Sequence, residues 1–435
     1  MKITRQHALV CLWAAIAAVS LAVNSRATTW DVGPTRTLKT PCQAIAIAAA
    51  DDTIMIDYSP SNAPGVGYYD DTCAWTTNNL TLIGVLDSSG ARPVMNCAGL
   101  TDTRKTGHLA NHKAIWDPEG SNTVIENLEF ENATLNNADG ANGAGIRVDG
   151  SNLTVLNCYF HNNQDGILES NIAGSNIVIE NSEFFQNGVS DPRLKAGFGQ
   201  THNLYIGHCA SLTFEFNYTH DANVGHLLKS RAAVNYILYN RITGENGTDS
   251  YEIDLPNGGT SYVVGNEIQQ GPNTGNSTII SYLEEGTNAN NPGHDLYVVN
   301  NTIVNQLGSG TFVVADSPAL PVLLENNIFY GAGTITNQAN ASQVTNFSVL
   351  SNPSMFVDFN NYNYMLSSTA GSPPIDSGTT PGTSSEGFSL VPVWQFVLET
   401  NSAGGNVECE QSRTTVNVID IGAYELGGSG STMCG

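Results

Sequence analysis

The stretch THDANVGHLLKSRAAVNYILYNR at 219–241 holds the densest group of side chains that could do chemistry. Lys229, Arg231 and Arg241 fall within thirteen positions, although the whole chain has only 16 Lys plus Arg against 40 Asp plus Glu. His226 stands three residues before the lysine. Such local basicity in an acidic chain predicts a site for an anionic substrate, with these four residues as catalytic candidates. The alternative is a set of salt bridges to nearby acids.

Two acids follow in the segment SYEIDLPNGG. If Leu228 and Ile253 occupy matching inward positions, 25 residues apart, then Lys229 lies beside Asp254. Glu252 and Asp254 alternate on one predicted strand, so their side chains should point to the same side. Carboxylates bind Ca²⁺, and paired carboxylates also act as acid and base in glycosidases. We expect Ca²⁺ at these two acids, if the protein uses a cofactor; otherwise Asp254 simply pairs with the lysine.

Polar and aromatic residues on the neighbouring segments could bind the substrate, because their rings and polar tips suit both stacking and hydrogen bonding. Inserted loops at about 186–201 and 271–295 would form walls on either side of 202–270. The substrate-binding residues that we predict are His202, Tyr205, His208, His220, Tyr251 and Tyr282.

The composition limits the class of protein. The chain has 435 residues, a net charge of -24 and only 13% charged residues. This acidity argues against nucleic acid as a partner. A hydrophobic share of 40% excludes a disordered chain, and helical spacing of apolar residues is missing. With 43 Gly among many Asn, Ser and Thr, the sequence favours a β-rich, turn-rich extracellular protein.

The N-terminus has the pattern of a secretory signal. Lys2 and Arg5 precede an apolar stretch from Ala8 to Val23, and small residues follow. This predicts a signal peptide over 1–27 and a secreted, periplasmic or cell-surface protein; the alternative is an uncleaved membrane anchor. No later apolar run approaches membrane length, so we expect no transmembrane segment in the mature chain, which we expect to be a monomer.

Eight cysteines occur, one of them in the signal segment. In an oxidising compartment some of the others should form disulfides. The cysteines close enough in sequence for local pairing are Cys42, Cys73 and Cys97, and then Cys409 with Cys434. Cys158 and Cys209 lie in repeated strands and are expected as buried free thiols, and the odd number leaves at least one cysteine unpaired.

A short motif recurs along the chain, in which an Asn is followed by two polar residues and then by an aromatic residue or Ile. Clear copies are IENLEF at 125–130, VLNCYF at 155–160 and IENSEF at 179–184. The residues that close the motif are Phe130, Phe160, Phe184, Tyr218, Ile242, Ile268, Ile303 and Ile328, with a base period near 24–26 residues. A second strand lies between successive motifs, which predicts at least two strands per period.

A unit of this size cannot bury its apolar face alone, and stacking of copies along one axis gives a parallel β-helix in which equivalent Asn residues form a ladder. A β-propeller would need repeats of about 40–50 residues. Over roughly 30–345 the chain resembles the secreted right-handed parallel β-helix proteins of the pectin-lyase-like group. The resemblance implies an all-β solenoid over 28–345, with a short Ala-rich capping helix within 41–58. We expect a C-terminal cap over 346–426 and a flexible tail over 427–435.

The stretch LLKSRAAVNYILYNRIT resembles the lysine-bearing turn of β-helix alginate and chondroitin lyases, where a Lys-Ser pair precedes an Asn-rich strand. The resemblance implies that Lys229 is the base of a β-elimination on an acidic, uronic-acid polysaccharide. Those lyases carry an Arg one turn later as the acid, whereas this chain has Glu-Ile-Asp there, so Arg231 or Arg241 would have to replace it. Two alternatives stay open: a C-5 epimerase, and a non-catalytic carbohydrate-binding or surface-adhesion β-helix.

Overall fold

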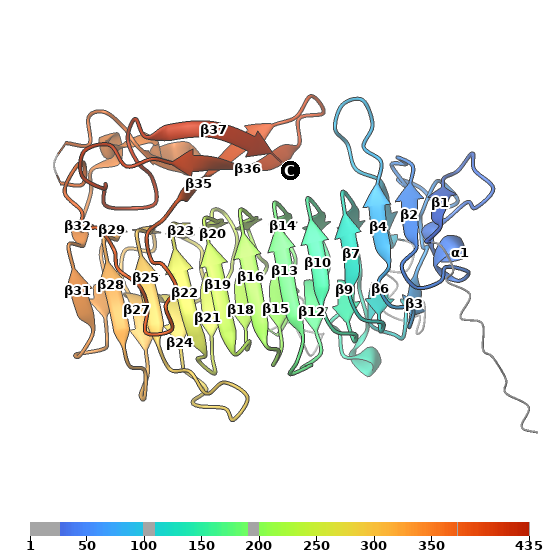
Figure 1. The fold of residues 1–435 in the computed structure, drawn as a ribbon, viewed down its shortest axis with the longest axis horizontal. Helices are drawn as coiled ribbons and strands as arrows, with labels where there is room; N and C mark the ends of the chain where they lie inside the picture. Colours follow the sequence, from blue (N-terminus) through green and yellow to red (C-terminus); the bar gives the residue numbers. More distant parts are fainter. Residues whose placement is uncertain (1–26, 99–108, 190–199, 372, 435) are drawn as a thin grey trace, which may run out of the picture.

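The computed structural model describes residues 27–98, 109–189, 200–371 and 373–434, so the predicted signal peptide lies outside the described residues except for its last position. The chain forms a right-handed parallel β-helix, in which each full turn supplies one strand to each of three long parallel sheets (Figure 1). This confirms the fold class expected from the repeat.

Sheet A has twelve strands, all parallel. Its strands are β1 (Thr29–Val32), β2 (Thr53–Ile56), β4 (Thr81–Gly84), β7 (Thr123–Glu126), β10 (Leu153–Leu156), β13 (Asn176–Glu180), β16 (Ser211–Glu215), β19 (Val234–Leu238), β22 (Thr260–Val264), β25 (Leu296–Val299), β28 (Val322–Glu325) and β31 (Ser342–Val344).

Sheet B has ten strands and contains the second strands that the sequence predicted between the motifs. They are β3 (Cys73–Trp75), β6 (Ala114–Pro118), β9 (Ala144–Val148), β12 (Asp165–Glu169), β15 (Leu204–Ile206), β18 (Leu228–Ser230), β21 (Ile253–Leu255), β24 (Thr278–Tyr282), β27 (Thr311–Ala315) and β30 (Thr334–Thr336).

Sheet C has ten strands and contains the closing residues of the motif. They are β5 (Val94–Asn96), β8 (Glu129–Glu131), β11 (Tyr159–His161), β14 (Glu183–Phe185), β17 (Tyr218–His220), β20 (Arg241–Thr243), β23 (Glu267–Gln270), β26 (Thr302–Asn305), β29 (Ile328–Tyr330) and β32 (Phe347–Val349).

The core is a column of apolar side chains stacked from turn to turn. The rings of Phe130, Phe160 and Phe184 stack with centroid separations of 5.1 and 5.0 Å, close to the spacing of neighbouring strands. The same register continues through Thr219 and Phe329, and not through the predicted Tyr218 and Ile328.

The one-residue error has a local cause in the turn before the strand. In the early turns the motif Asn has a positive φ, as at Asn157 (φ 49), and the inward residue follows three positions later. In the fourth motif Phe216 takes that positive φ (56), and Asn217 comes one position later. The inward residue is still three positions after the positive φ, which makes it Thr219 and not Tyr218.

A ladder of buried asparagines runs through the later turns and satisfies turn backbone groups, as the sequence predicted. Asn266 is typical: its Nδ2 donates to the Ile237 carbonyl at 2.8 Å and to Asn301 Oδ1 at 3.0 Å. Its own Oδ1 accepts from the backbone N–H of Asn240 at 2.9 Å. The members of this ladder are Asn217, Asn240, Asn266, Asn301, Asn327 and Asn346.

The helix expected near the N-terminus is only one turn long. Helix α1 spans Pro41–Ile45 and contacts strands β1 and β2 with Pro41, Ala44 and Ile45 buried. Short 3-10 helices occur at Asn137–Asp139 (η2), Pro353–Met355 (η3) and Phe359–Asn361 (η4). Among the described residues, no helix is long and apolar enough to cross a membrane.

The C-terminal segment turns back along the side of the β-helix (Figure 1). After a short hairpin of β33 (Phe356–Asp358) and β34 (Asn363–Leu366), strands β35 (Trp394–Thr400), β36 (Asn406–Arg413) and β37 (Ser429–Cys434) form an antiparallel sheet. Asn401 Nδ2 donates to the carbonyl of Gly90, and Asn181 Nδ2 donates to that of Glu408. The segment therefore covers a flank of the helix as far as its early turns.

Strand β37 occupies most of the segment 427–435, which the sequence predicted as a flexible tail. Strand β37 pairs with β36, and the Cys409–Cys434 disulfide joins the two strands. A second disulfide links Cys42 to Cys73, while Cys97, Cys158 and Cys209 are buried free thiols. The Cys409–Cys434 pair and the two free thiols expected in the repeat are thus confirmed, and among the three N-terminal cysteines it is Cys97 that stays unpaired.

We expect Asn266→Ala to lower the free energy of unfolding by about 1–3 kcal/mol, because it leaves two buried backbone groups of the preceding turn, the Ile237 carbonyl and the Asn240 N–H, without this partner. Chemical denaturation monitored by circular dichroism measures this. The control is Asn290→Ala on an exposed loop, which should match the wild type. Equal stability of the two variants would show that the ladder does not stabilise the fold.

Candidate functional site

The outer face of sheet B brings together residues from three consecutive turns. The register pairs Tyr205 with Lys229 and Lys229 with Asp254, while Leu228 pairs with Ile253. Lys229 Nζ donates to Asp254 Oδ2 at 2.7 Å, and both residues are buried. The neighbour relation predicted from a spacing of 25 residues is confirmed, and the ion pair exists.

Two histidines and a tyrosine stack beside this pair. The rings of His202 and His226 lie 4.6 Å apart, and Tyr251 lies 4.9 Å beyond His226. His202 Nδ1 accepts from the backbone N–H of His226 at 2.9 Å, and His226 Nδ1 accepts from that of Tyr251 at 3.2 Å. Since both Nδ1 atoms are acceptors, the proton of each neutral ring is on Nε2.

Burial strongly lowers the pKa of His202 and of His226, and the nearby charges of Lys229 and Arg231 lower both further. Both rings are therefore neutral. His226 Nε2 lies 3.4 Å from Asp254 Oδ2, the same oxygen that accepts from Lys229. In this tautomer His226 is a hydrogen-bond donor toward the site and has no free lone pair with which to act as a base.

Arg231 forms the second cationic group of the site. Its Nε donates to the hydroxyl of Tyr205 at 2.9 Å, and its two terminal nitrogens contact Glu285 at 2.7 and 2.9 Å. Glu285 also approaches Lys229 Nζ at 3.7 Å, and about half of its side chain is exposed. The solvent-exposed carboxylate of Glu285 thus contacts both cations, Lys229 and Arg231.

The loop between β24 and β25 provides this carboxylate and one neighbouring acid. Glu284 accepts from the hydroxyl of Tyr251 at 2.6 Å. Asn288, farther along the loop, lies 3.3 Å from His208 Nε2, which places His208 at the edge of the site. The sequence predicted that this loop forms a wall of the site, but not that Glu284 and Glu285 take part in it. The Glu-Glu pair within an inserted segment is the sequence feature that could have indicated them.

Arg241 and His220 do not belong to this site. Arg241 lies on sheet C, where its guanidinium pairs with Glu245 and Glu267 and lies over the Tyr218 ring. His220, also on sheet C, is bonded to carboxylates through both ring nitrogens. A turn of about 25 residues circles the molecule, so residues near Lys229 in sequence reach a different face.

Glu252 and Tyr282 also lie elsewhere. Tyr282 is fully buried and its hydroxyl donates to the Gly259 carbonyl, so its ring cannot stack on a ligand. Glu252 is fully buried too, and the acid whose charge acts on it is Asp249, whereas Asp254 pairs with Lys229. The two acids expected to share a Ca²⁺ therefore have different neighbours, and within the described chain neither belongs to a group with metal-ligand spacing.

The buried acid pair makes stability depend on pH. Desolvation, followed by the charge of Asp249, raises the pKa of Glu252 well above its usual value near 4.5, and desolvation raises that of Asp249 to about 6. As the pH rises above the ordinary pKa of these carboxyl groups, the unfolded chain loses protons that the folded chain retains, so the free energy of unfolding falls.

We expect Glu252→Gln, which keeps the shape and a hydrogen-bond donor, to lose less stability than the wild type between about pH 5 and about pH 8. Urea denaturation at several pH values measures the difference. Glu399→Gln changes an exposed glutamate and serves as the control. Parallel curves for all three proteins would contradict the buried-pair explanation.

Comparison with known proteins shows the fold. No protein-family model matches the sequence, and a search of curated proteins finds no match. Among solved structures, the crystal structure of pectate lyase Pel9A superposes with a TM-score of 0.58 at 15% identity, over 92% of this chain and 97% of that one.

Two other structures superpose less well. They are a pectin methylesterase from Aspergillus niger (TM-score 0.32, 12% identity, 78% of this chain and 90% of that one) and ORF18 of Geobacillus virus E2 (0.37, 11%, 90% and 72%). At such identities the likeness to Pel9A concerns the fold alone, and that fold is the right-handed parallel β-helix.

Proposed function

We propose that this protein binds an acidic, uronic-acid polysaccharide along the outer face of sheet B and cleaves it by β-elimination. One observation carries the proposal: Lys229, Arg231 and Tyr205 lie together on one face of a long β-helix, beside two neutral histidines. The pectate lyase likeness supports a carbohydrate substrate. A polymer fits a rod with repeating turns, because its units can contact successive turns.

In this reaction a base removes the proton on the carbon beside the uronate carboxylate. The freed electron pair forms a C=C bond, and the glycosidic oxygen leaves with a proton from an acid. That carbon becomes acidic only when its carboxylate is neutralised, for which a two-point contact with a guanidinium is well suited. We assign this task to Arg231, whose two-point contact is taken by Glu285 in the free protein.

We assign Lys229 as the base and Tyr205 as the acid. Lys229 must first lose its ammonium proton, and Asp254 lies 2.7 Å away to accept it. Burial raises the pKa of Asp254, which favours its protonated form and so supports this transfer. The Tyr205 oxygen accepts from Arg231 Nε, which leaves its own proton free for the departing oxygen.

A second candidate is binding without cleavage. It is favoured by the ion pairs themselves, since Asp254 neutralises Lys229 and Glu285 neutralises Arg231 in the free protein. A C-5 epimerase would use the same proton abstraction and return a proton to the opposite face. The three activities differ in product: unsaturated ends, solvent hydrogen exchange without cleavage, or no chemical change.

We expect Lys229→Met to reduce lyase activity by about 10²–10⁴-fold, the usual contribution of a general base. It should also lower the free energy of unfolding by about 3 kcal/mol, because Asp254 is left buried without its partner. The far-ultraviolet absorbance of new unsaturated ends on a panel of uronic-acid polymers measures activity.

Lys229→Met combined with Asp254→Asn separates the two effects. The double variant should regain stability and remain inactive. Activity that survives in Lys229→Met would mean that the base is elsewhere. Absence of cleavage by the wild type, together with polymer binding, would favour the second candidate.

We expect Glu285→Gln to bind uronic-acid oligosaccharides more tightly than the wild type, by about tenfold, because the substrate carboxylate no longer competes with Glu285 for Arg231. Calorimetric titration measures the affinity. Glu284→Gln removes the same charge one position away and is the matched control. An equal gain in both variants would indicate a general charge effect and not competition at Arg231.

A further inference from the structure

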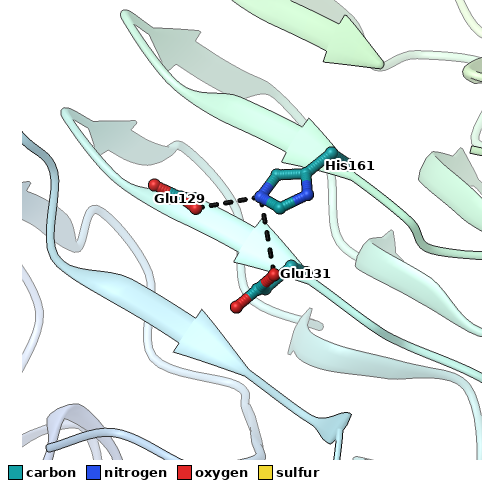
Figure 2. Close-up of side chains that lie close together, drawn as sticks. All are labelled: Glu129, Glu131 and His161. Atoms are coloured by element: carbon teal, nitrogen blue, oxygen red, sulfur yellow. Dashed lines mark hydrogen bonds and ion pairs between the residues drawn. The ribbon is translucent and has the colours of Figure 1, made fainter. Parts of the chain in front are cut away.

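We propose that Glu129, Glu131 and His161, on the outer face of sheet C, form a binding site for a divalent first-row transition-metal ion such as Zn²⁺. The three side chains converge from neighbouring strands (Figure 2). This cluster is on a different sheet from Lys229 and is independent of the function proposed above.

The register of the sheet creates the cluster. Glu129 and Glu131 alternate on β8, so both point to the same side, and β11 pairs His161 directly with Glu131. His161 Nε2 lies 2.9 Å from Glu129 Oε1 and 3.7 Å from Glu131 Oε2. Ligand atoms about 2.0 Å from a tetrahedral Zn²⁺ are roughly 3.3 Å apart, so the observed separations lie on either side of the required value.

The surrounding residues orient the three ligands. Asn96 Nδ2 donates to Glu131 Oε1 at 2.6 Å, which leaves Oε2 facing the histidine. Asn162 lies 3.1 Å from His161 Nδ1, and the Tyr159 ring stacks on the imidazole at 4.3 Å. Such outer contacts fix the ring and the carboxylate of metal sites.

No lysine or arginine compensates the charges of the two carboxylates among the described residues, since none forms an ion pair with Glu129 or Glu131. A divalent ion would compensate the two carboxylates. An imidazole nitrogen among the ligands favours a transition metal over Ca²⁺, which takes oxygen ligands.

A second group has similar spacing but is less suited to a metal ion than the Glu129, Glu131 and His161 cluster. It consists of His220, Asp221 and Glu245. There His220 is held between Asp221 and Glu183, and these hydrogen bonds outweigh desolvation and raise its pKa to about 9. An imidazolium cannot ligate a metal. Glu245 already accepts from Tyr218, Thr243 and Arg241. His161 has carboxylates only at Nε2, and its Nδ1 contacts the Asn162 amide, so Nε2 can bind a metal ion when Nδ1 carries the ring proton.

An ion could reach the cluster from a neighbouring cleft. Glu129 lines this cleft together with Arg92, Tyr159, Glu183 and the loop at 401–406 of the C-terminal segment. Asn406 Nδ2 donates to Glu183 Oε1 at 2.8 Å, so the C-terminal segment forms one wall. The cluster is thus partly buried yet open on one side.

The test is calorimetric titration of the full-length, chelator-treated protein with Zn²⁺ alone. We expect one Zn²⁺ per chain and a loss of affinity of about tenfold or more in His161→Gln. Zn²⁺ should also raise the melting temperature of the wild type but not of Glu129→Gln/Glu131→Gln, a variant that keeps side-chain shape. His112→Gln, which changes another histidine beside an acid, is the control and should bind like the wild type.

Saturable binding that depends on His161 and on both glutamates supports the site. The proposal is overturned by the absence of saturable Zn²⁺ binding. It is also overturned by binding that is unchanged in His161→Gln, or by Ca²⁺ binding as tightly as Zn²⁺.

Discussion

The structure depends on one constraint: each turn of the β-helix must satisfy its backbone and its apolar face through the next turn. Parallel strands about 4.8 Å apart bring equivalent residues into contact, so a side chain is stabilised by its equivalents above and below. The phenylalanine stack uses this spacing for the core, and the Asn266 ladder uses it for buried polar groups. No turn has a complete core of its own, which explains why the period extends along most of the chain.

The same stacking assembles the sheet B site. A basic residue, an acid and an aromatic residue about 25 positions apart become neighbours on one face, as Tyr205, Lys229 and Asp254 do. The histidine stack uses the backbone of each following turn to fix the tautomer of the ring before it. The fold thus determines both the position and the protonation of groups that could act on a bound polymer.

The C-terminal segment adds contacts that the repeat does not supply. It covers part of sheet C, where it approaches Glu183 and Arg92 through Asn406 and Glu408. Burial of Glu408 raises its pKa to about 8, with the charge of Glu183 as the next cause. The C-terminal segment thereby encloses acidic side chains of sheet C, and the outer faces of sheets B and C differ chemically.

The sequence was enough to predict the solenoid, its sheet B strands, the Cys409–Cys434 disulfide and the pairing of Lys229 with Asp254. All of these follow from periodicity or from short separations along the chain. Three features became visible only in the folded chain: the separation of Arg241 from Lys229, the burial of Glu252 and the approach of Glu285 to Arg231. Whether a polar residue faces solvent, core or a loop depends on where the chain bends within each turn. Composition and spacing do not fix those bends, because a shift of one residue moves a side chain to another face.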